Sequence, residues 1–478
     1  MVRRDAFSPV LGSNPSSGRI PLRRAVSVIA MAACALFLAT PVSAESISGA
    51  LARAYGFNPD LNQQRAAARA VDENLPTALS GYRPTVTATA DIGRSWSESN
   101  LPGGVTTRNA SNPRGAALSV NQNIWNGNRT LNGVRRADSQ ILLARENIRI
   151  TEQVTLAAGA TSYMNVLRDT AILSLRRNNV EVLEQQLRQT RDRFQVGEVT
   201  RTDVAQAEAS LAQGQADSFT AQSNLQTSIA NFRQVVGIEP RNLQPARPVE
   251  KLLPRTLDVA LGLSLTEHPA IQAALHNVDA ASLNVKVIEG QLYPTLGVTG
   301  TVSKRYDPIT SPGSDVLSAS VVGSLSVPIY EGGAVYSAVR QSKELLGQAR
   351  LQADLQREQI RANVVSSWGV WLNSKSVIEA AQAQVRAAEI ALNGVREEAK
   401  VGQRTTLDVL NAQQALLNAR VLLVTAQRDR VVSSYAVLAS IGRLSASNLG
   451  LQVVTYDPTI HYDQVKGKWI GTSTPDGR

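Results

Sequence analysis

Cysteine is almost absent from this sequence of 478 residues: Cys34 is the only one, and there are three histidines. Because Cys34 lies in a segment that we expect to be removed on export, the exported chain would have no disulfide and few ligands for zinc. The sequence also has no P-loop, no Gly-x-Ser-x-Gly and no His-Glu-x-x-His pattern, which are common marks of nucleotide, hydrolase and metalloprotease sites. We therefore expect no enzyme, no cofactor and no metal site.

Aromatic residues are scarce at 4%, whereas 43% of the residues are hydrophobic. A composition of small and aliphatic residues is more typical of long helices than of a compact aromatic core. The net charge is +10, but no dense basic run has aromatic residues interspersed. We therefore expect no nucleic-acid partner.

The N-terminal segment has the pattern of an export signal. Arginines precede an apolar stretch over residues 25–38, and small residues lead up to Ala44. This stretch is too short for a stable membrane anchor, so we predict a signal peptide over residues 1–44 and a mature start at Glu45. The alternative to cleavage after Ala44 is cleavage before Cys34 and lipidation of that cysteine. No later apolar run approaches the roughly 20 residues of a membrane helix, so the exported protein would be soluble or would meet a membrane as β-strands.

Proline is missing from two long stretches, between Pro113 and Pro240 and between Pro328 and Pro458. Proline disrupts a helix interior, so its absence permits very long helices. Apolar residues recur at spacings of three and four, as the seam between two packed helices requires. Each stretch is expected to form a helical hairpin whose first helix is roughly 100 Å long. The hairpins are predicted over 128–236 and 334–441.

The sequence repeats itself. Residues 82–85 match 292–295, and residues 124–127 match 329–332. Each half begins with a helical pattern, over about 46–80 and 256–290. For the tail, packing along the helices and partial disorder both remain open. The expected division is a first repeat over 45–238, a proline-rich linker over 239–255, a second repeat over 256–441 and a C-terminal tail over 442–478.

Between the short and the long helices of each half, apolar and polar residues alternate with the period of a β-strand. The polar positions are mostly Ser, Thr and Asn, which suits a water-filled lumen, and about ten residues suffice to cross a bilayer at a tilt. Loops are expected over about 93–114 and 304–316, and a soluble β-hairpin packed on a helix is the alternative. The strands are predicted over 85–92, 116–124, 295–303 and 318–327. Aromatic residues that would form an interfacial belt at one rim are Tyr82, Trp125, Tyr293 and Tyr330.

Four membrane strands cannot close a barrel, because the smallest outer-membrane barrels have about eight. An open sheet edge is not tolerated in lipid. Several copies of the chain must therefore pool their strands, and three copies would supply twelve.

One motif occurs twice, as Val-Gly-x-x-Thr-x-x-Asp-Val over residues 196–204 and 401–409. Glycine commonly follows the end of a helix, and a threonine with an acidic residue three positions later commonly begins one. Each copy is therefore predicted to be the tip of a long hairpin. Whether these residues only cap helices or also share one function at both tips remains open.

Residues 324–333 and 400–410 resemble motifs of the TolC family of outer-membrane efflux and secretion ducts, and the resemblance covers essentially the whole mature chain. It implies a mainly α fold with membrane β, in which a homotrimer forms a twelve-stranded outer-membrane β-barrel that continues into a twelve-helix periplasmic α-barrel. It also implies a periplasmic adaptor, an inner-membrane RND or ABC pump, and a role as the exit duct of a tripartite efflux pump or type I secretion system. The first half departs from the family pattern at 121–123. A non-channel coiled-coil protein of the cell envelope is the alternative.

The resemblance also implies roles for residues at the tips. The family closes its tip with a tyrosine–arginine–aspartate network and lines the constriction with acidic residues. Ala399 stands at the tyrosine position and Asn411 at the deeper acidic position, so part of the network and one ring of charge are missing. This predicts a looser or differently held gate with weaker cation selectivity. The gate residues are Arg404, Asp408 and Asn411. The adaptor-docking residues are Val196, Gly197, Thr200, Asp203, Val401, Gly402 and Thr405.

Overall fold

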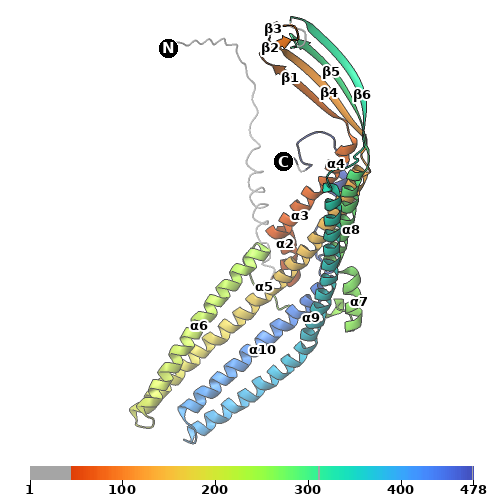
Figure 1. The fold of residues 1–478 in the computed structure, drawn as a ribbon. Coiled ribbons are helices and arrows are strands. Elements are labelled where there is room, and N and C mark those ends of the chain that lie inside the picture. Colours follow the sequence, from red (N-terminus) through yellow and green to blue (C-terminus); the bar gives the residue numbers. More distant parts are fainter. Residues whose placement is uncertain (1–44, 310–312, 476, 478) are drawn as a thin grey trace, which may run out of the picture. The chain divides into compact units, whose positions relative to one another are not determined.

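The computed structural model describes residues 45–309, 313–475 and 477 (Figure 1). The predicted signal peptide, with Cys34, lies outside the described residues. Most of the described chain is helical, and its strands form one four-stranded and one two-stranded sheet. None of the described helices is both long enough and apolar enough to cross a membrane.

Each half begins with short helices that a proline divides. Asn58 and His268 accept a hydrogen bond from the amides of Asp60 (3.0 Å) and Ala270 (3.1 Å), and a proline follows each cap as the first helical residue. Proline suits this position because its missing N–H would have no partner within the helix. The helices of the first half are α2 (Ile47–Phe57), α3 (Pro59–Asp72), α4 (Asn74–Leu79) and the 3₁₀ turn η2 (Ser80–Tyr82). Those of the second half are α7 (Leu257–Glu267), α8 (Pro269–Glu289) and the 3₁₀ turn η4 (Gly290–Leu292).

The four-stranded sheet joins the two halves. Its order is β1-β4-β5-β6, and all neighbouring strands are antiparallel. The central pair therefore consists of the second strand of one repeat and the first strand of the other, while β1 and β6 form the edges. The strands are β1 (Thr85–Ile92), β4 (Arg114–Trp125), β5 (Thr295–Tyr306) and β6 (Asp315–Ser326).

The loop predicted over 93–114 contains a β-hairpin instead, so that prediction was wrong. Two glycines with φ of 104° and 80°, Gly103 and Gly104, form its turn, and Glu98 pairs with Arg108 across the strands at 3.0 Å. The segment is polar on both faces, so it lacks the alternation that identified the other strands. The predicted loop over 304–316 is also shorter than expected, because β5 and β6 continue into it, and three of its residues lie outside the described part of the chain. The hairpin strands are β2 (Ser95–Leu101) and β3 (Val105–Ser111).

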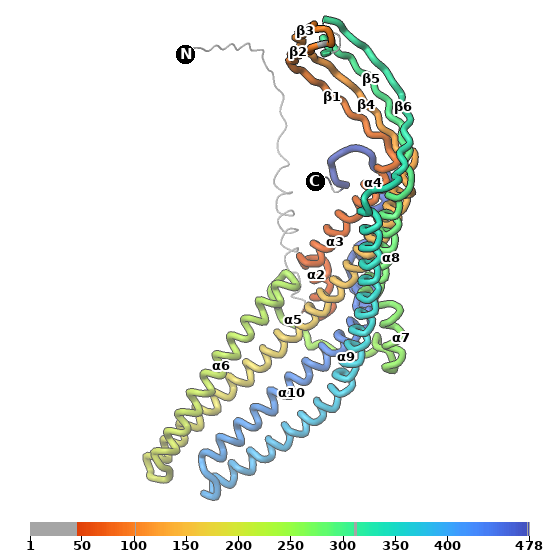
Figure 2. Tube along the Cα trace, viewed as in Figure 1, coloured from red at the N-terminus to blue at the C-terminus, as the bar shows by residue number. Residues whose placement is uncertain are grey.

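The long helices form two antiparallel hairpins. The outgoing helices α5 and α9 each have 67 residues, which corresponds to about 100 Å. The main hydrophobic core lies where α5 packs on α2 and α3, around the fully buried Tyr163, Phe232 and Leu156. Within residues 45–478 the sheet lies at one end of the long helices and both tips lie at the other (Figure 2). The four helices are α5 (Arg129–Gln195), α6 (Arg201–Val236), α9 (Ala334–Lys400) and α10 (Thr406–Ser440).

The described part of the tail packs along the helices, which decides between the two possibilities left open for it. The Ala446 amide donates to Glu152 at 2.7 Å, and the Tyr456 amide donates to the Tyr55 hydroxyl at 3.0 Å. Further along, a short helix, α11, lies against α3. Its buried His461 lies 2.9 Å from the Asp72 carboxylate. The bounds of α11 are Pro458–Val465.

Candidate functional site

The tip of the first hairpin combines a helix stop and a helix start. Gly197 has a left-handed φ of 79°, and the Glu198 amide donates to the carbonyl of Arg193 at 2.9 Å, as in a Schellman motif. Thr200 then caps α6, because its Oγ1 accepts from the Asp203 amide at 3.3 Å and its own amide donates to the Asp203 carboxylate at 2.9 Å. This reciprocal capping box defines the beginning of the return helix.

The second tip has the same geometry. Gly402 has φ 77°, and the Gln403 amide donates to the Glu398 carbonyl at 3.0 Å. Thr405 Oγ1 accepts from the Asp408 amide at 3.2 Å, and the Asp408 carboxylate accepts from the Thr405 amide at 2.9 Å. The repeated motif therefore forms a repeated structure, and capping accounts for the threonine, the aspartate and the glycine of each copy.

The two capping aspartates have the same electrostatic character. Hydrogen bonds from the Thr200 hydroxyl and amide hold the pKa of Asp203 below its usual range, and bonds from the Thr405 amide and hydroxyl do the same for Asp408. Both carboxylates therefore remain ionised at neutral pH. Each places a negative charge at the positive end of a helix, where it is stabilising.

The tips differ in their ion pairs. In the first tip Arg193, near the end of α5, pairs with Glu198 at 3.0 Å. In the second tip the helix end supplies the acid, and Arg404 Nε donates to Glu398 at 2.8 Å. The structure thus does not join Arg404 directly to Asp408, as a shared gate network would require: Arg404 bonds Glu398, while Asp408 is held by its own capping box. Sequence reasoning missed Glu398, because a partner six residues away is brought close only by the turn.

Exposed apolar side chains surround both capping boxes. Val196 and Val401 are each 72% exposed, and Phe194 and Leu407 are also largely accessible. Asn411 lies one turn further along α10 and is exposed as well. Both tips therefore present a small apolar surface beside an ionised carboxylate.

Polar side chains connect the two hairpins above the tips. Arg396 donates to Gln413 Oε1 at 2.9 Å, and Gln413 Nε2 donates to Asn179 at 3.4 Å. Higher up, Arg428 Nε donates to Asn165 at 2.9 Å. These residues could not be identified from the sequence, because the sequence of a long helix does not show which other helix a given polar side chain will contact.

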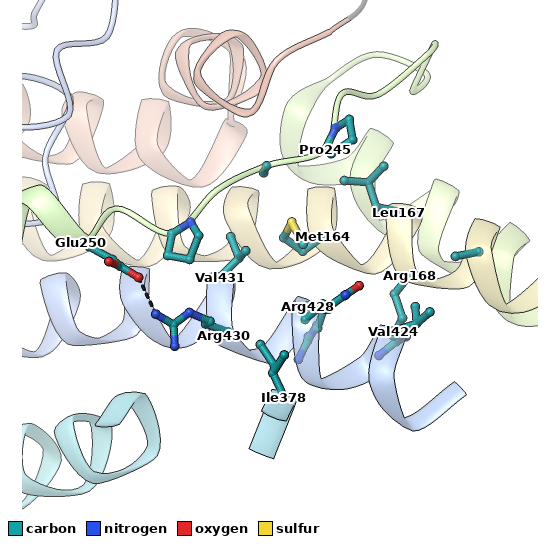
Figure 3. Close-up of a pocket in the computed structure, with 14 residues that line it drawn as sticks. Met164, Leu167, Arg168, Pro245, Glu250, Ile378, Val424, Arg428, Arg430 and Val431 are labelled. Carbon is teal, nitrogen blue, oxygen red and sulfur yellow. Dashed lines mark hydrogen bonds and ion pairs between the residues drawn. The ribbon is translucent and has the colours of Figure 1, made fainter. Parts of the chain in front are cut away.

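A cavity of about 490 Å³ lies between α5, α10 and the linker (Figure 3). Its wall is mostly apolar, and Arg430 reaches Glu250 of the linker at 2.5 Å. The other two guanidiniums in the wall, those of Arg168 and Arg428, are likewise paired with the neighbouring carboxylates on their own helices. The Arg430–Glu250 pair joins the linker to α10, and all three guanidiniums in the wall have a carboxylate partner.

The register of the sheet brings the four flanking aromatics to one end. Thr85 lies opposite Asn121, Trp125 opposite Leu296 and Thr295 opposite Ser326. The starts of β1 and β5 therefore lie beside the ends of β4 and β6. All four aromatic side chains are exposed, by 39–80%: Tyr82, Trp125, Tyr293 and Tyr330.

Comparisons with known proteins agree with this architecture. Residues 50–238 and 260–443 match the family model described as "Outer membrane efflux protein". The chain is 41% identical to the outer membrane efflux protein BepC of Brucella suis, over 91% of this chain and 93% of that protein. It is 26% identical to the outer membrane protein TolC of Escherichia coli, over 82% of this chain and 81% of that protein. The fold is similar to that of the Campylobacter jejuni CmeC outer membrane channel, with a TM-score of 0.74, 16% identity and coverage of 88% of this chain and 89% of that one.

Proposed function

Because this chain belongs to the outer membrane efflux protein family and is therefore a transport protein of the outer membrane, we propose that it forms the exit duct of a tripartite efflux pump or a type I secretion system. Substrates would enter from an inner-membrane pump of the RND or ABC class and leave through the outer membrane. The observation that carries the proposal is a four-stranded sheet with two open edges and an aromatic rim, joined directly to long paired helices.

The open sheet edges support a trimer. β1 and β6 have no strand partner on their outer sides within the described chain, and unpaired backbone groups are not tolerated in lipid. The large apolar side chains of β6 are exposed, Val321 by 80% and Leu317 by 69%. Three copies that pair β6 with the next β1 would close a barrel of twelve strands, a size found among outer-membrane barrels.

The helices support the same assembly. Among the long helices, α5 packs on α6, α9 on α10 and α5 on α10, and α6 has a smaller contact with α10. Figure 2 shows them in the order α6, α5, α10, α9, so α6 and α9 are the outer members of the row. α9 exposes many large apolar side chains, more than a solvated helix needs. A neighbouring copy would cover them and extend the row into a twelve-helix tube. They include Leu345, Leu351, Leu355, Val370, Leu372, Val377 and Ile390.

The tips would then form the periplasmic end of the duct. The exposed Val196 and Val401 and the capping boxes beside them fit the hairpin of a periplasmic adaptor, because they offer apolar contact next to an ordered helix start. Asp408 and Asn411 lie on one face of α10 at a spacing of three residues, with Arg404 just before the helix. We assign these three residues to the constriction.

Replacement of Asp408 by alanine is expected to weaken the preference for cations and to lower the single-channel conductance for cations, because a ring of negative charge at the constriction would be lost. The matched control is Asp203→Ala, which removes the same capping box from the other hairpin. Loss of a cap costs about 1 kcal/mol in either variant, so any effect of fraying is common to both. No change in conductance or ion preference would remove Asp408 from the gate, and equal changes in both variants would reduce its role to capping.

Deletion of the gene should sensitise the cells to drugs and detergents, or remove proteins from the culture medium, or both. Complementation with the wild-type gene should restore the lost phenotype. The competing function, a coiled-coil scaffold of the envelope, predicts neither export defect and predicts release of the chain into the soluble periplasm. Fractionation of the membranes together with these assays separates the two functions.

A further inference from the structure

The end of the C-terminal tail reaches the junction between the sheet and the helices. Arg83, which stands two residues before β1, donates from its guanidinium to the carbonyl of Lys468 at 2.8 Å. The same guanidinium lies 4.5 Å from the centre of the Trp469 ring. The preceding residue, Tyr82, belongs to the aromatic rim, so the tail ends at the level of that rim (Figure 1).

The tail is held along its way to this point. The amides of Ala446 and Tyr456 donate to Glu152 and to Tyr55. The buried contact between His461 and Asp72 holds α11 on α3. Tyr462 lies under the guanidinium of Arg145 on α5, at 5.1 Å from the ring centre. These contacts fix the position of the tail end, so its exposed side chains are presented by a defined structure.

Two large apolar side chains at this end are mostly exposed in the described part of the chain. Trp469 is 67% exposed and Ile470 is 89% exposed. Lys466 and Lys468 precede them, and Lys466 pairs with Asp463 at 2.8 Å. Tryptophan beside an aliphatic residue and lysines is the composition of a segment that lies in the headgroup region of a bilayer.

We propose that residues 466–471 are a membrane-interface anchor that inserts Trp469 and Ile470 among the phospholipid headgroups of the periplasmic leaflet. The proposal rests on the proposed function, because it requires the rim of the sheet to lie at that leaflet. The proposal also requires the anchor to lie on the outer face of the tube, where lipid is present. The aliphatic stems of the two lysines would lie along the same interface. Their ammonium groups are held within the chain, that of Lys466 by Asp463 at 2.8 Å and that of Lys468 by the carbonyl of Ser473 at 2.5 Å.

The test uses the full-length exported protein in vesicles of phosphatidylethanolamine and phosphatidylglycerol. Residues 45–478 have no cysteine, so Ile470→Cys introduces a unique thiol for an environment-sensitive fluorophore. The matched control is Val454→Cys, at a residue of the same tail that is 96% exposed. The label at position 470 should emit at shorter wavelength and be quenched several-fold more strongly by lipids with a headgroup nitroxide than the label at position 454.

Two outcomes would overturn the proposal. Equal accessibility of both labels to aqueous iodide, without quenching by lipid, would mean that the tail end stays in water. Protection of position 470 from iodide without quenching by lipid would mean that protein covers it, as a neighbouring copy could. Either result leaves the duct itself untouched, since pore conductance in the same vesicles reports on that function separately.

Discussion

Replacement of Gly332 by alanine is expected to abolish the trimer proposed above. Gly127 and Gly332 hold matching positions in the two repeats, each between the last strand of its pair and a long helix, with φ of 66° and 65°. A Cβ on Gly127 would lie 2.3 Å from the Gly290 carbonyl oxygen, whereas a Cβ on Gly332 would meet nothing within 4 Å among the described residues. The space beside Gly127 is therefore occupied by a turn of the second repeat, whereas the space beside Gly332 is empty in the described chain.

The internal repeat indicates which element of a neighbouring copy would lie beside Gly332. Gly290 lies at the start of η4, and the matching turn of the first repeat is η2. In a closed ring, η2 of the next copy would approach Gly332 as η4 approaches Gly127. Left-handed backbone alone costs alanine roughly 1–2 kcal/mol. A collision between the new Cβ and backbone atoms adds to that cost at every junction of the ring.

Two control variants separate the collision from the strain. Gly104→Ala places alanine at a φ of 80° in the turn of the β2–β3 hairpin, again with nothing within 4 Å, and should leave the trimer intact. Gly127→Ala should prevent the folded chain from accumulating, because the collision lies within one chain. The readouts are unboiled gels and mass measurement in mild detergent. A Gly332→Ala trimer as heat-stable as that of Gly104→Ala would contradict the proposed ring closure.

The helices could be predicted closely because local signals define their ends. These signals are prolines, and the glycine and threonine of each tip, and each can be recognised from a few neighbouring residues. The second hairpin, predicted over 334–441, consists of α9 (Ala334–Lys400) and α10 (Thr406–Ser440). The β2–β3 hairpin could not be predicted, because most of its residues are polar and apolar and polar side chains do not alternate along it. The same limit applies to function. The capping pairs are local, but the partner of Arg404 and the path of the tail depend on contacts that form only when the chain folds.

Acidification from pH 7 to pH 4 is expected to destabilise the folded chain by up to about 3 kcal/mol through His268 alone. This side chain is 6% exposed, and its Nδ1 must stay unprotonated to accept the Ala270 amide and cap α8. Burial is the main reason why the pKa of His268 is lowered from 6.5 to about 4. The positive charge of Arg149 lowers it further, whereas a hydrogen bond to the Ala439 carbonyl acts in the opposite direction. Between these values the unfolded chain binds a proton that the folded chain does not, so stability falls as the pH falls through this window.

The first repeat supplies the control substitution. Asn58 caps α3 at the matching position with nearly the same backbone, φ −53° and ψ 123° against φ −67° and ψ 123°, so His268→Asn keeps the cap and removes the titrating group. Thermal unfolding followed by circular dichroism should give similar stability for both proteins at pH 7 and a wild-type deficit of about 2 kcal/mol at pH 5. Carboxylates with a lowered pKa, such as that of Glu267, affect stability only at lower pH. Parallel pH profiles for wild type and His268→Asn would show that the buried imidazole is protonated in the folded protein, and the predicted penalty would then be absent.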